Sequence, residues 1–451
     1  MPKLTIIGAG STVFTKNIVV DLLTIDKFES IEISLMDIDV KRLDKTYELL
    51  KIIFKKFNLK PRISKFTNRK EALQNADFVQ TTIQVGGYKP ATIIDFEIPK
   101  KYGLQQTIAD TLGIGGIMRG LRTIPVLLDI AKDISEVCPT ALWMQYVNPM
   151  SANMIAINKV YPEIKSIGLC HSVQGTIQML ANDLNESIED IDYLCAGINH
   201  MSFYQKITKK STGEDLYPKL KILAEKIIND EQMSTRTMKK EYFTDKKLHE
   251  KIRYEILKRF GYFVTESSEH FAEYVPWFIK KNRNDLIEKY KIPIGEYLDR
   301  CKLYIDMWDK LNIDISPLSN QVFKRSNEYA SYILEAVIKN RETTVYGNVI
   351  NNGLIENLPS NCCVEVPCIV NEKGFQPNKI GALPEHLACL MRTNINVHLL
   401  TAEAAITKKK EKIYHAAMLD PLTSSNLSID EIYKMTDEMI DAHGSYLPNY
   451  N

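Results

Sequence analysis

Two short segments of the chain carry side chains that could bind a metal ion. Cys170 lies in Gly168-Leu169-Cys170-His171-Ser172, and His200 closes the later run Gly197-Ile198-Asn199-His200. A single buried cysteine or histidine is usually an ordinary core residue, so neither is informative alone. The spacing does not match a zinc knuckle, and no nearby cluster supplies four ligands. The pair therefore favours an open two-ligand site that substrate oxygens and water complete, which suits catalysis.

A glycine-containing loop near the start of the chain could bind a dinucleotide. Residues 4–7 form an apolar run that leads into Gly8-Ala9-Gly10-Ser11. Two such glycines allow the tight turn and close approach that a pyrophosphate needs at a helix N-terminus. Val13 occupies the position of the third glycine, and a plain strand-turn-helix capped by Ser11 would look the same. Asp37, after the second apolar run, favours the dinucleotide interpretation and NAD over NADP, because a carboxylate repels a 2′-phosphate.

The elements that must position these residues alternate between strand and helix. Strands are predicted at 4–7, 31–36, 62–66, 78–83, 141–147 and 165–169, with helices at 17–23, up to 56, and at 117–137. This alternation predicts an α/β fold with an N-terminal Rossmann-like, doubly wound parallel sheet. Ligands of such sheets bind at the carboxyl ends of the strands. Asp37, Gly86, Asn148 and Cys170 all follow predicted strands, so we expect them at one edge.

Beyond residue 200 the pattern changes to longer helices, which predicts a second, α+β domain. Helices are expected at 216–229, 247–260, 285–290, 328–338 and 394–407, and strands at 345–349 and 364–369. The predicted division is residues 1–195 for the dinucleotide-binding domain and 196–451 for an α+β catalytic and oligomerisation domain. No Pro/Gly/Ser-rich linker lies near residue 195, so we expect the two domains to pack rigidly.

Composition excludes several other classes of protein. The chain has 451 residues, 45% of them hydrophobic and 25% charged, with a net charge of +1. This balance gives no electrostatic reason to expect nucleic acid or an anionic membrane as a partner. No apolar stretch approaches the ~20 residues of a membrane span, and no signal peptide is visible. Eight cysteines without a CxxC pair indicate reduced thiols and a cytoplasmic location.

Longer motifs give a specific resemblance. The chain resembles the NAD- and manganese-dependent glycosidases of glycoside hydrolase family four, and within them the melibiose-type α-galactosidases, over essentially its full length. The motifs that carry the resemblance are Ile6–Thr12, Leu35–Asp39, Gln106–Gly113, Gly115–Arg119, Tyr146–Met150, Gly168–Gly175, Ala196–His200, Glu266–Tyr274 and Asn361–Val366.

The resemblance implies a hydrolysis that uses a redox cofactor. In this family NAD oxidises C3 of the sugar, a base removes the C2 proton, the C1 leaving group is eliminated, water adds, and C3 is reduced again. A divalent cation, usually Mn²⁺, stabilises the negative charge on the C2 and C3 oxygens. Such enzymes are an exception to the usual scheme of two catalytic carboxylates. The implied activity is hydrolysis of melibiose and other small α-galactosides.

The resemblance also implies roles for individual residues. Cys170 and His200 match the metal ligands, although a thiolate is a soft partner for Mn²⁺ and is open to oxidation. Asn148 matches a substrate-binding position. Asp110 matches a carboxylate that raises the basicity of the catalytic base, although an Asp before Gly113 would also suit an ordinary turn. The implied cofactor-binding residues are Gly8, Gly10, Ser11, Thr12, Asp37 and Gly86.

The catalytic acid and base remain open at this stage. The phospho-glycosidase branch has Asp after the metal-binding cysteine, whereas this chain has His171, which could act as an acid near neutral pH or contact substrate. That branch uses a tyrosine base in a segment corresponding to residues 262–274. Glu269 and His270 are the candidates here, with Tyr274 behind them.

Several alternatives remain. Thr92 lies near the place where the phospho branch has an arginine, which argues against a phosphorylated sugar. An α-glucosidase or an α-glucuronidase or galacturonase of the same family would carry the same Cys-His pair. A lactate/malate-like dehydrogenase would need an Asp-His pair and a carboxylate-binding arginine in a context that Asn199-His200-Met201 does not supply. An NAD sensor would not need the metal ligands. The apolar C-terminal helices resemble the subunit interface of the family, which implies a homodimer or homotetramer.

Overall fold

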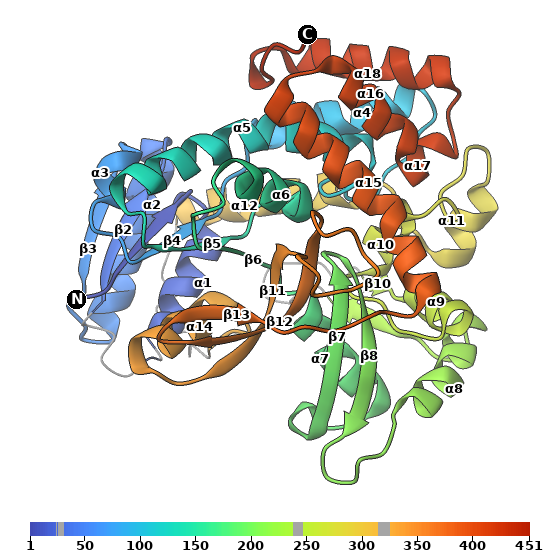
Figure 1. The fold of residues 1–451 in the computed structure, drawn as a ribbon, viewed down its shortest axis with the longest axis horizontal. Helices are drawn as coiled ribbons and strands as arrows, with labels where there is room; N and C mark the ends of the chain where they lie inside the picture. The colour runs from blue at the N-terminus through green and yellow to red at the C-terminus, as the bar shows by residue number, and fades with distance from the viewer. Residues whose placement is uncertain (24, 26–30, 238–246, 314–324) are drawn as a thin grey trace.

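The computed structural model describes residues 1–23, 25, 31–237, 247–313 and 325–451 (Figure 1). Eleven strands of these residues form one sheet in the order β3-β2-β1-β4-β5-β6-β11-β12-β7-β8, with β13 paired to β12. Two further strands, β9 (Thr235–Thr237) and β10 (Lys247–His249), form a separate antiparallel pair.

The first six strands of the sheet are parallel. Strands β1, β4, β5 and β6 are buried along their whole length, as apolar runs covered on both faces should be. The six parallel strands lie in the order 3-2-1-4-5-6, which is that of dinucleotide-binding sheets. The predicted doubly wound sheet is therefore confirmed. The strands are β3 (Arg62–Phe66), β2 (Glu32–Met36), β1 (Lys3–Ile7), β4 (Phe78–Thr81), β5 (Leu142–Gln145) and β6 (Ser166–Leu169).

Helices cover both faces of this sheet. Helices α3, α5, α6 and the C-terminal α15 pack together on the upper side in Figure 1, while α1 and α14 pack together below. The helix α2 illustrates the local cause, because Leu43, Leu50 and Ile53 form its buried face and Asp39 caps its first turn. The helices of this half are α1 (Thr12–Leu22), α2 (Val40–Lys56), α3 (Arg69–Leu73), η2 (Gly87–Thr92), α4 (Ile93–Lys101), α5 (Gly113–Val137), α6 (Met150–Val160), α7 (Ser172–Leu184) and η3 (Ile188–Asp190).

The sheet continues beyond β6 with antiparallel strands from later in the chain. Strand β11 (Thr343–Ile350) pairs with β6 and with β12 (Cys363–Asn371), which also pairs with β13 (Gly374–Pro377). Strand β12 pairs with β7 (Ile191–Ile198), which forms a hairpin with β8 (Met201–Lys209). Strands β11 and β12 were predicted from the sequence, whereas β7 and β8 were not. The division of the chain at residue 195 stays a prediction, although one sheet runs across it.

The remaining helices surround this extension and close the upper face. The prediction of a helix from residue 247 is wrong for its first three residues, which form β10, and α15 begins at Glu385 instead of residue 394. No helix in the described part of the chain is long and apolar enough to span a membrane. These helices are α8 (Tyr217–Ile228), α9 (Lys251–Phe260), α10 (Ser268–Tyr274), α11 (Asn284–Tyr290), α12 (Glu296–Ile313), α14 (Tyr329–Lys339), α15 (Glu385–Thr407), α16 (Lys410–Leu419), α17 (Pro421–Ser424), α18 (Ile429–His443) and η4 (Gly444–Tyr446).

Candidate active site

The fold brings Cys170 and His200 together at the carboxyl edge of the parallel strands. Cys170 follows directly after β6, and His200 lies in the two-residue turn between β7 and β8. The backbone of His200 is left-handed there, with φ 64°, which a tight turn can require. The Cys170 Sγ and His200 Nε2 atoms are 3.4 Å apart, so one cation could contact both.

Glu266 adds a third ligand to this pair. Its Oε2 lies 3.6 Å from His200 Nε2. The ligand atoms of Cys170, His200 and Glu266 all lie within 4.8 Å of one another. A thiol, an imidazole and a carboxylate that converge in this way form a donor set for a divalent transition metal. The residues present therefore fit the metal ion that the resemblance implies.

The His200 ring is oriented by contacts on its other nitrogen. Nδ1 lies 3.0 Å from the Tyr274 hydroxyl and 3.3 Å from Thr111 Oγ1, while Nε2 faces Cys170 and Glu266. Hydrogen bonding at Nδ1 leaves the Nε2 lone pair for a metal, an arrangement common in metal sites. Burial lowers the pKa of His200 to about 4, against the opposing effect of Glu266. The imidazole is therefore neutral at physiological pH, as a ligand must be.

Cys170 carries its proton in the absence of a cation. Burial, with the nearby carboxylates of Glu266 and Glu365, raises the pKa of the Cys170 thiol well above its usual value. A bound divalent cation would supply the opposing charge and displace the proton, since the thiolate is the form that binds metals.

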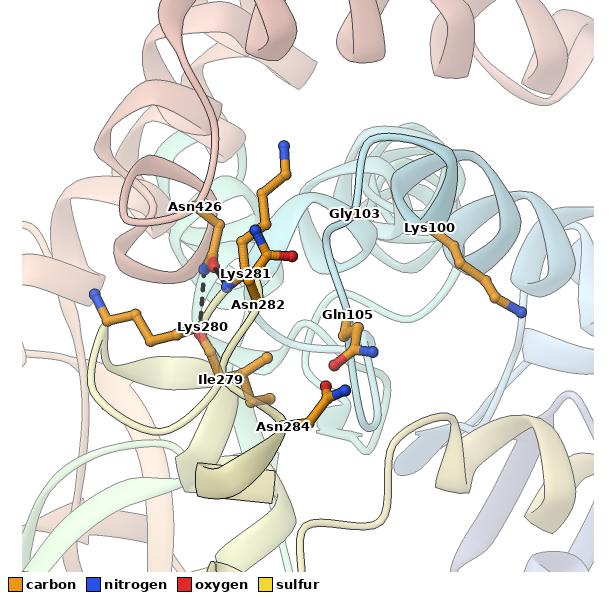
Figure 2. A pocket seen from close by; sticks show the side chains of 9 residues that line it. All are labelled: Lys100, Gly103, Gln105, Ile279, Lys280, Lys281, Asn282, Asn284 and Asn426. Carbon is orange, nitrogen blue, oxygen red and sulfur yellow. Dashed lines mark hydrogen bonds between the residues drawn. The ribbon is translucent and has the colours of Figure 1, made fainter. Parts of the chain in front are cut away.

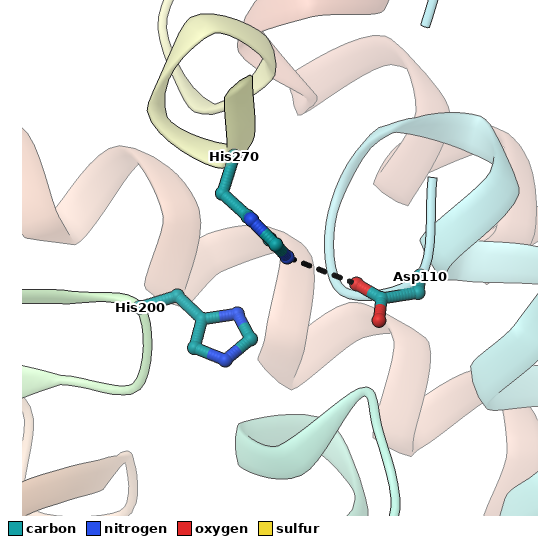
Figure 3. Close-up of side chains that lie close together, drawn as sticks. All are labelled: Asp110, His200 and His270. Atoms are coloured by element: carbon teal, nitrogen blue, oxygen red, sulfur yellow. Dashed lines mark ion pairs between the residues drawn. The ribbon is translucent and has the colours of Figure 1, made fainter. Parts of the chain in front are cut away.

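A second group of titratable residues adjoins the first through His200. Figure 3 shows Asp110 and His270 facing each other beside the His200 ring, and Asp110 Oδ1 lies 3.9 Å from His270 Nε2. The other Asp110 oxygen accepts a hydrogen bond of 3.1 Å from Asn148 Nδ2. Burial would raise the pKa of Asp110, but His270, Arg119 and His200 outweigh it and hold that pKa below its usual value. Asp110 is therefore an anion that can orient or polarise His270.

A buried glutamate holds the loop that presents Asp110. The Glu273 carboxylate accepts hydrogen bonds from the backbone N–H groups of Thr107, Ile108 and Ala109. Ala109 has a left-handed backbone, with φ 54°. Three N–H groups converging on one side chain fix this unusual turn, so the Asp110 side chain leaves it in a defined direction.

Two predicted catalytic residues lie apart from these clusters. The His171 side chain is 62% exposed and its Nδ1 lies 3.8 Å from Glu328 Oε1. The Glu269 carboxylate is buried 3.8 Å from Arg300 and belongs to neither cluster of the described residues. His270, the next residue on the same helix α10, points from a different side of the helix and does reach the site.

The glycine loop has the form that a dinucleotide requires. A side chain at Gly8 would overlap the carbonyl oxygen of Thr82, and one at Gly10 would lie 2.7 Å from Asp37 Oδ2. The Gly10 N–H donates to that oxygen at 2.7 Å, which ties the loop to the end of β2. Ser11 precedes α1, whose first residue Thr12 has a side chain outside the described part. A backbone-lined turn that meets a helix N-terminus and an acid fits the pyrophosphate and ribose of NAD.

The last predicted cofactor residue lies in the connection after β4, which ends at Thr81 and not at residue 83 as predicted. Gly86 follows β4 and has φ 78°, and a side chain there would overlap Ala91. Close packing therefore requires glycine at this position. Thr92, in the same connection, is buried, and its hydroxyl donates to the carbonyl of Gly87.

A cavity of about 230 Å³ lies elsewhere and contains none of the predicted site residues. Figure 2 shows that the ammonium groups of Lys100 and Lys280 point away from one another, so the lining lysines do not converge on a ligand. It is lined by Lys100, Gly103, Gln105, Ile279, Lys280, Lys281, Asn282, Asn284 and Asn426.

Three residues of the site were not singled out from the sequence. Glu266 and Thr111 belong to the motifs that carry the family resemblance, which was the only signal for them. Glu365 also belongs to one of these motifs, Asn361–Val366, and its polar character within a buried strand was a second signal. Its side chain accepts hydrogen bonds from Ser202 and Asn348.

Two family models match most of the chain. The model of the family 4 glycosyl hydrolases matches residues 3–186, and that of the family 4 C-terminal domain matches residues 195–423. The chain is 49% identical over 450 residues to an α-galactosidase of Bacillus subtilis (strain 168), covering 100% of both. It is 33% identical to an α-galactosidase of Rhizobium meliloti (strain 1021), covering 99% of this chain and 89% of that one.

A solved structure shows the same fold. It is that of a 6-phospho-α-glucosidase from gut microorganisms in complex with NAD and Mn²⁺, with a TM-score of 0.77, 20% identity and coverage of 100% of both chains. The fold and the site define a glycoside hydrolase built on a dinucleotide-binding sheet. The chain belongs to family 4 of the glycosyl hydrolases. The resemblance found in the motifs is therefore confirmed.

Proposed function

We propose that this protein hydrolyses melibiose and other small α-galactosides with the help of NAD and a divalent cation. The observation that carries the proposal is the similarity over the whole length to the α-galactosidase of Bacillus subtilis. The site supports the chemistry, because a metal-binding donor set lies at the carboxyl edge of a dinucleotide-binding sheet.

The residues that would hold the two groups come from separate elements. Cys170, His200 and Glu266 would hold the cation, and Gly8, Gly10, Ser11, Thr12, Asp37 and Gly86 would hold the cofactor. When bound, NAD supplies reversible hydride transfer and the cation supplies positive charge for the oxygens at C2 and C3. Of the three donors, the soft thiolate is the least suited to Mn²⁺, so a softer divalent transition metal is also compatible with the site.

The proposed base comes from the second cluster, and the proposed acid from outside it. His270 Nε2 lies 3.9 Å from the anionic Asp110, and Ser267 Oγ lies 2.8 Å from the other ring nitrogen, so the imidazole is held in place from both sides. His270 is therefore the proposed base for the C2 proton, and Asn148 the proposed contact for sugar hydroxyls. His171, which directly precedes α7, is the proposed acid for the leaving group, and Glu269 is the second candidate for the base, although its carboxylate lies near Arg300.

An unphosphorylated sugar agrees with the connection after β4. Thr92 donates a hydrogen bond to the carbonyl of Gly87 and lies 3.1 Å from Gln84 Nε2. A buried hydroxyl used in this way offers no positive charge to a 6-phosphate.

We also propose that the protein is cytoplasmic and that it forms a homodimer or homotetramer. Light scattering of the purified protein tests the oligomeric state.

The first experiment is the release of p-nitrophenol from its α-galactoside, with and without NAD, Mn²⁺ and a thiol reductant. We expect hydrolysis only with all three, and no net NADH, because the hydride returns to the sugar. If the α-glucoside or a uronide were cleaved instead, the proposed mechanism would stand, but the proposed galactoside specificity would be wrong. Net NADH without sugar release would support a dehydrogenase and overturn the proposal.

A further inference from the structure

An ionisable side chain lies in the middle of the extended sheet, where an apolar residue would be expected. Glu365 belongs to β12, which is flanked by β11 and β7, and its side chain is fully buried. Burying a carboxylate costs free energy that hydrogen bonds only partly return, and an apolar residue of equal volume is often more stabilising. The position of Glu365 therefore calls for a reason other than stability.

One row of paired residues crosses five strands through this glutamate. Gly168 on β6 pairs with Asn348 on β11, which pairs with Glu365, which pairs with Gly197 on β7, which pairs with Ser202 on β8. The row starts two residues before Cys170 and ends two residues after His200. It joins the two segments that carry the candidate metal ligands.

The contact toward Cys170 runs through Asn348. Its amide nitrogen lies 3.2 Å from Glu365 Oε1 and 3.3 Å from the carbonyl oxygen of Gly168. A side chain at Gly168 would lie 2.9 Å from the Asn348 Cβ, so glycine there permits the close approach. Glu365 thus fixes Asn348, and Asn348 holds the end of β6 from which Cys170 emerges.

The contact toward His200 runs through Ser202. The Ser202 hydroxyl lies 2.8 Å from Glu365 Oε2. The backbone of Ser202 is also paired with Thr265, since Ser202 N–H donates to Thr265 Oγ1 and Thr265 N–H donates to the carbonyl of Ser202. Thr265 directly precedes Glu266. The same serine therefore links Glu365 to the segments that carry the second and third candidate ligands.

We propose that Glu365 is a positioning residue that fixes the segments of Cys170, His200 and Glu266 relative to one another, so that the three ligands are preorganised for a divalent cation. It acts through Asn348 and Ser202 and is not itself a ligand. Groups that orient metal ligands typically change metal affinity by about 10–100-fold when they are removed. The proposal rests on the metal site of the proposed function.

The test is metal binding to the full-length protein after chelation, measured with Mn²⁺ by calorimetry and with Co²⁺ by the thiolate-to-cobalt charge-transfer absorption. Glu365→Met keeps the volume and removes both contacts, so we expect about 10–100-fold weaker Mn²⁺ binding and a weaker or shifted cobalt band. Glu365→Gln can accept from Asn348 and donate to Ser202, and should bind Mn²⁺ within a few-fold of the original protein. Should Glu365→Met fail to fold, Ser202→Ala, which removes one contact, should weaken binding several-fold.

The control is Asn351→Leu, at the end of the same β11. Asn351 is fully buried, and its side chain hydrogen-bonds to the backbone of Ile355, Leu358 and Pro359, so its loss destabilises the fold away from the three ligands. Unchanged metal binding in Glu365→Met or Ser202→Ala, or an equal loss in Asn351→Leu, would overturn the positioning role alone. Absence of metal binding by the unsubstituted protein would overturn both this role and the proposed metal site.

Discussion

At the scale of single residues, His200 shows how one ring can serve a site in two directions. Its Nε2 faces Cys170 and Glu266, while its Nδ1 contacts the Tyr274 hydroxyl. Burial keeps the imidazole neutral, and the hydrogen bond at Nδ1 determines which nitrogen is left for a cation. The ligand is thus prepared by its surroundings before a metal arrives.

Replacing the thiol should weaken the metal site strongly. We expect Cys170→Ser to lower Mn²⁺ affinity by more than about 100-fold, beyond the effect of a group that only orients a ligand, because a neutral hydroxyl is a poor ligand. Calorimetry with the metal-free protein measures this. Cys389→Ser, an exposed cysteine on α15, is the matched control and should bind normally. Equal affinity in both variants would remove Cys170 from the site.

Asp37 should determine the choice between the two nicotinamide cofactors. We expect Asp37→Ser to raise the affinity for NADP relative to NAD by about tenfold, since removing the carboxylate removes its repulsion of a 2′-phosphate. Asp39→Ser is the matched control, because a serine can still cap α2 as Asp39 does. Titrating both cofactors by protein fluorescence gives the ratio, and the same ratio in both variants would contradict the assignment.

At the scale of elements, the site depends on how closely strands approach one another. Helix-covered β6 meets the antiparallel β11 at Gly168, where a Cβ atom would lie 2.5 Å from Met150 Sδ and 2.9 Å from Asn348 Cβ. The seam between the parallel and antiparallel parts of the sheet is therefore tight where Cys170 leaves it. Glycine at this point is a packing requirement.

Two glycine-to-alanine substitutions should have opposite effects on stability. Gly168→Ala forces overpacking at the seam and should lower the free energy of unfolding by about 1–3 kcal/mol. Gly175→Ala lies on the exposed side of α7, meets nothing within 4 Å, and should raise that free energy by about 0.5–1 kcal/mol through helix propensity. Urea denaturation of both proteins is the measurement. An unchanged stability in Gly168→Ala would contradict the tight seam, and a destabilised Gly175→Ala would contradict the helix-propensity argument.

At the scale of the whole molecule, the candidate site ties together distant parts of the chain. Cys170 follows the last parallel strand, His200 lies in the antiparallel hairpin, and Glu266 lies just before α10. Helix α15 packs against α5 and α6 and joins the C-terminal region to the dinucleotide-binding half. A cation at the site would bind the folded chain in preference to the unfolded one, and so stabilise the entire arrangement.

The pH dependence of folding should change when Glu365 is replaced. Burial raises the pKa of Glu365 to about 7, so the folded protein holds this proton more tightly than the unfolded chain. The resulting stability is complete below the unfolded pKa of about 4.3 and is lost as pH rises through about 7. Between these two pH values, the free energy of unfolding of the unsubstituted protein should therefore fall, relative to that of Glu365→Gln, by at most about 1.4 kcal/mol per pH unit. Urea denaturation of the metal-free proteins checks this, and parallel profiles would contradict it.

Local patterns in the sequence determined the parallel half of the fold and the glycine loop. A strand buried on both faces is a short apolar run, and a tight turn before a helix needs glycine, so both can be recognised within a few residues. Residue types alone singled out Cys170 and His200, and motif resemblance supported their role as metal ligands and added Asp110 and His270. The β7–β8 hairpin was missed, although it carries His200. Which ligands meet was decided by the tertiary structure, because His200, Glu266 and Glu365 become neighbours only when antiparallel strands from later in the chain join the sheet. Their contacts are long-range in sequence, so no local pattern could encode them.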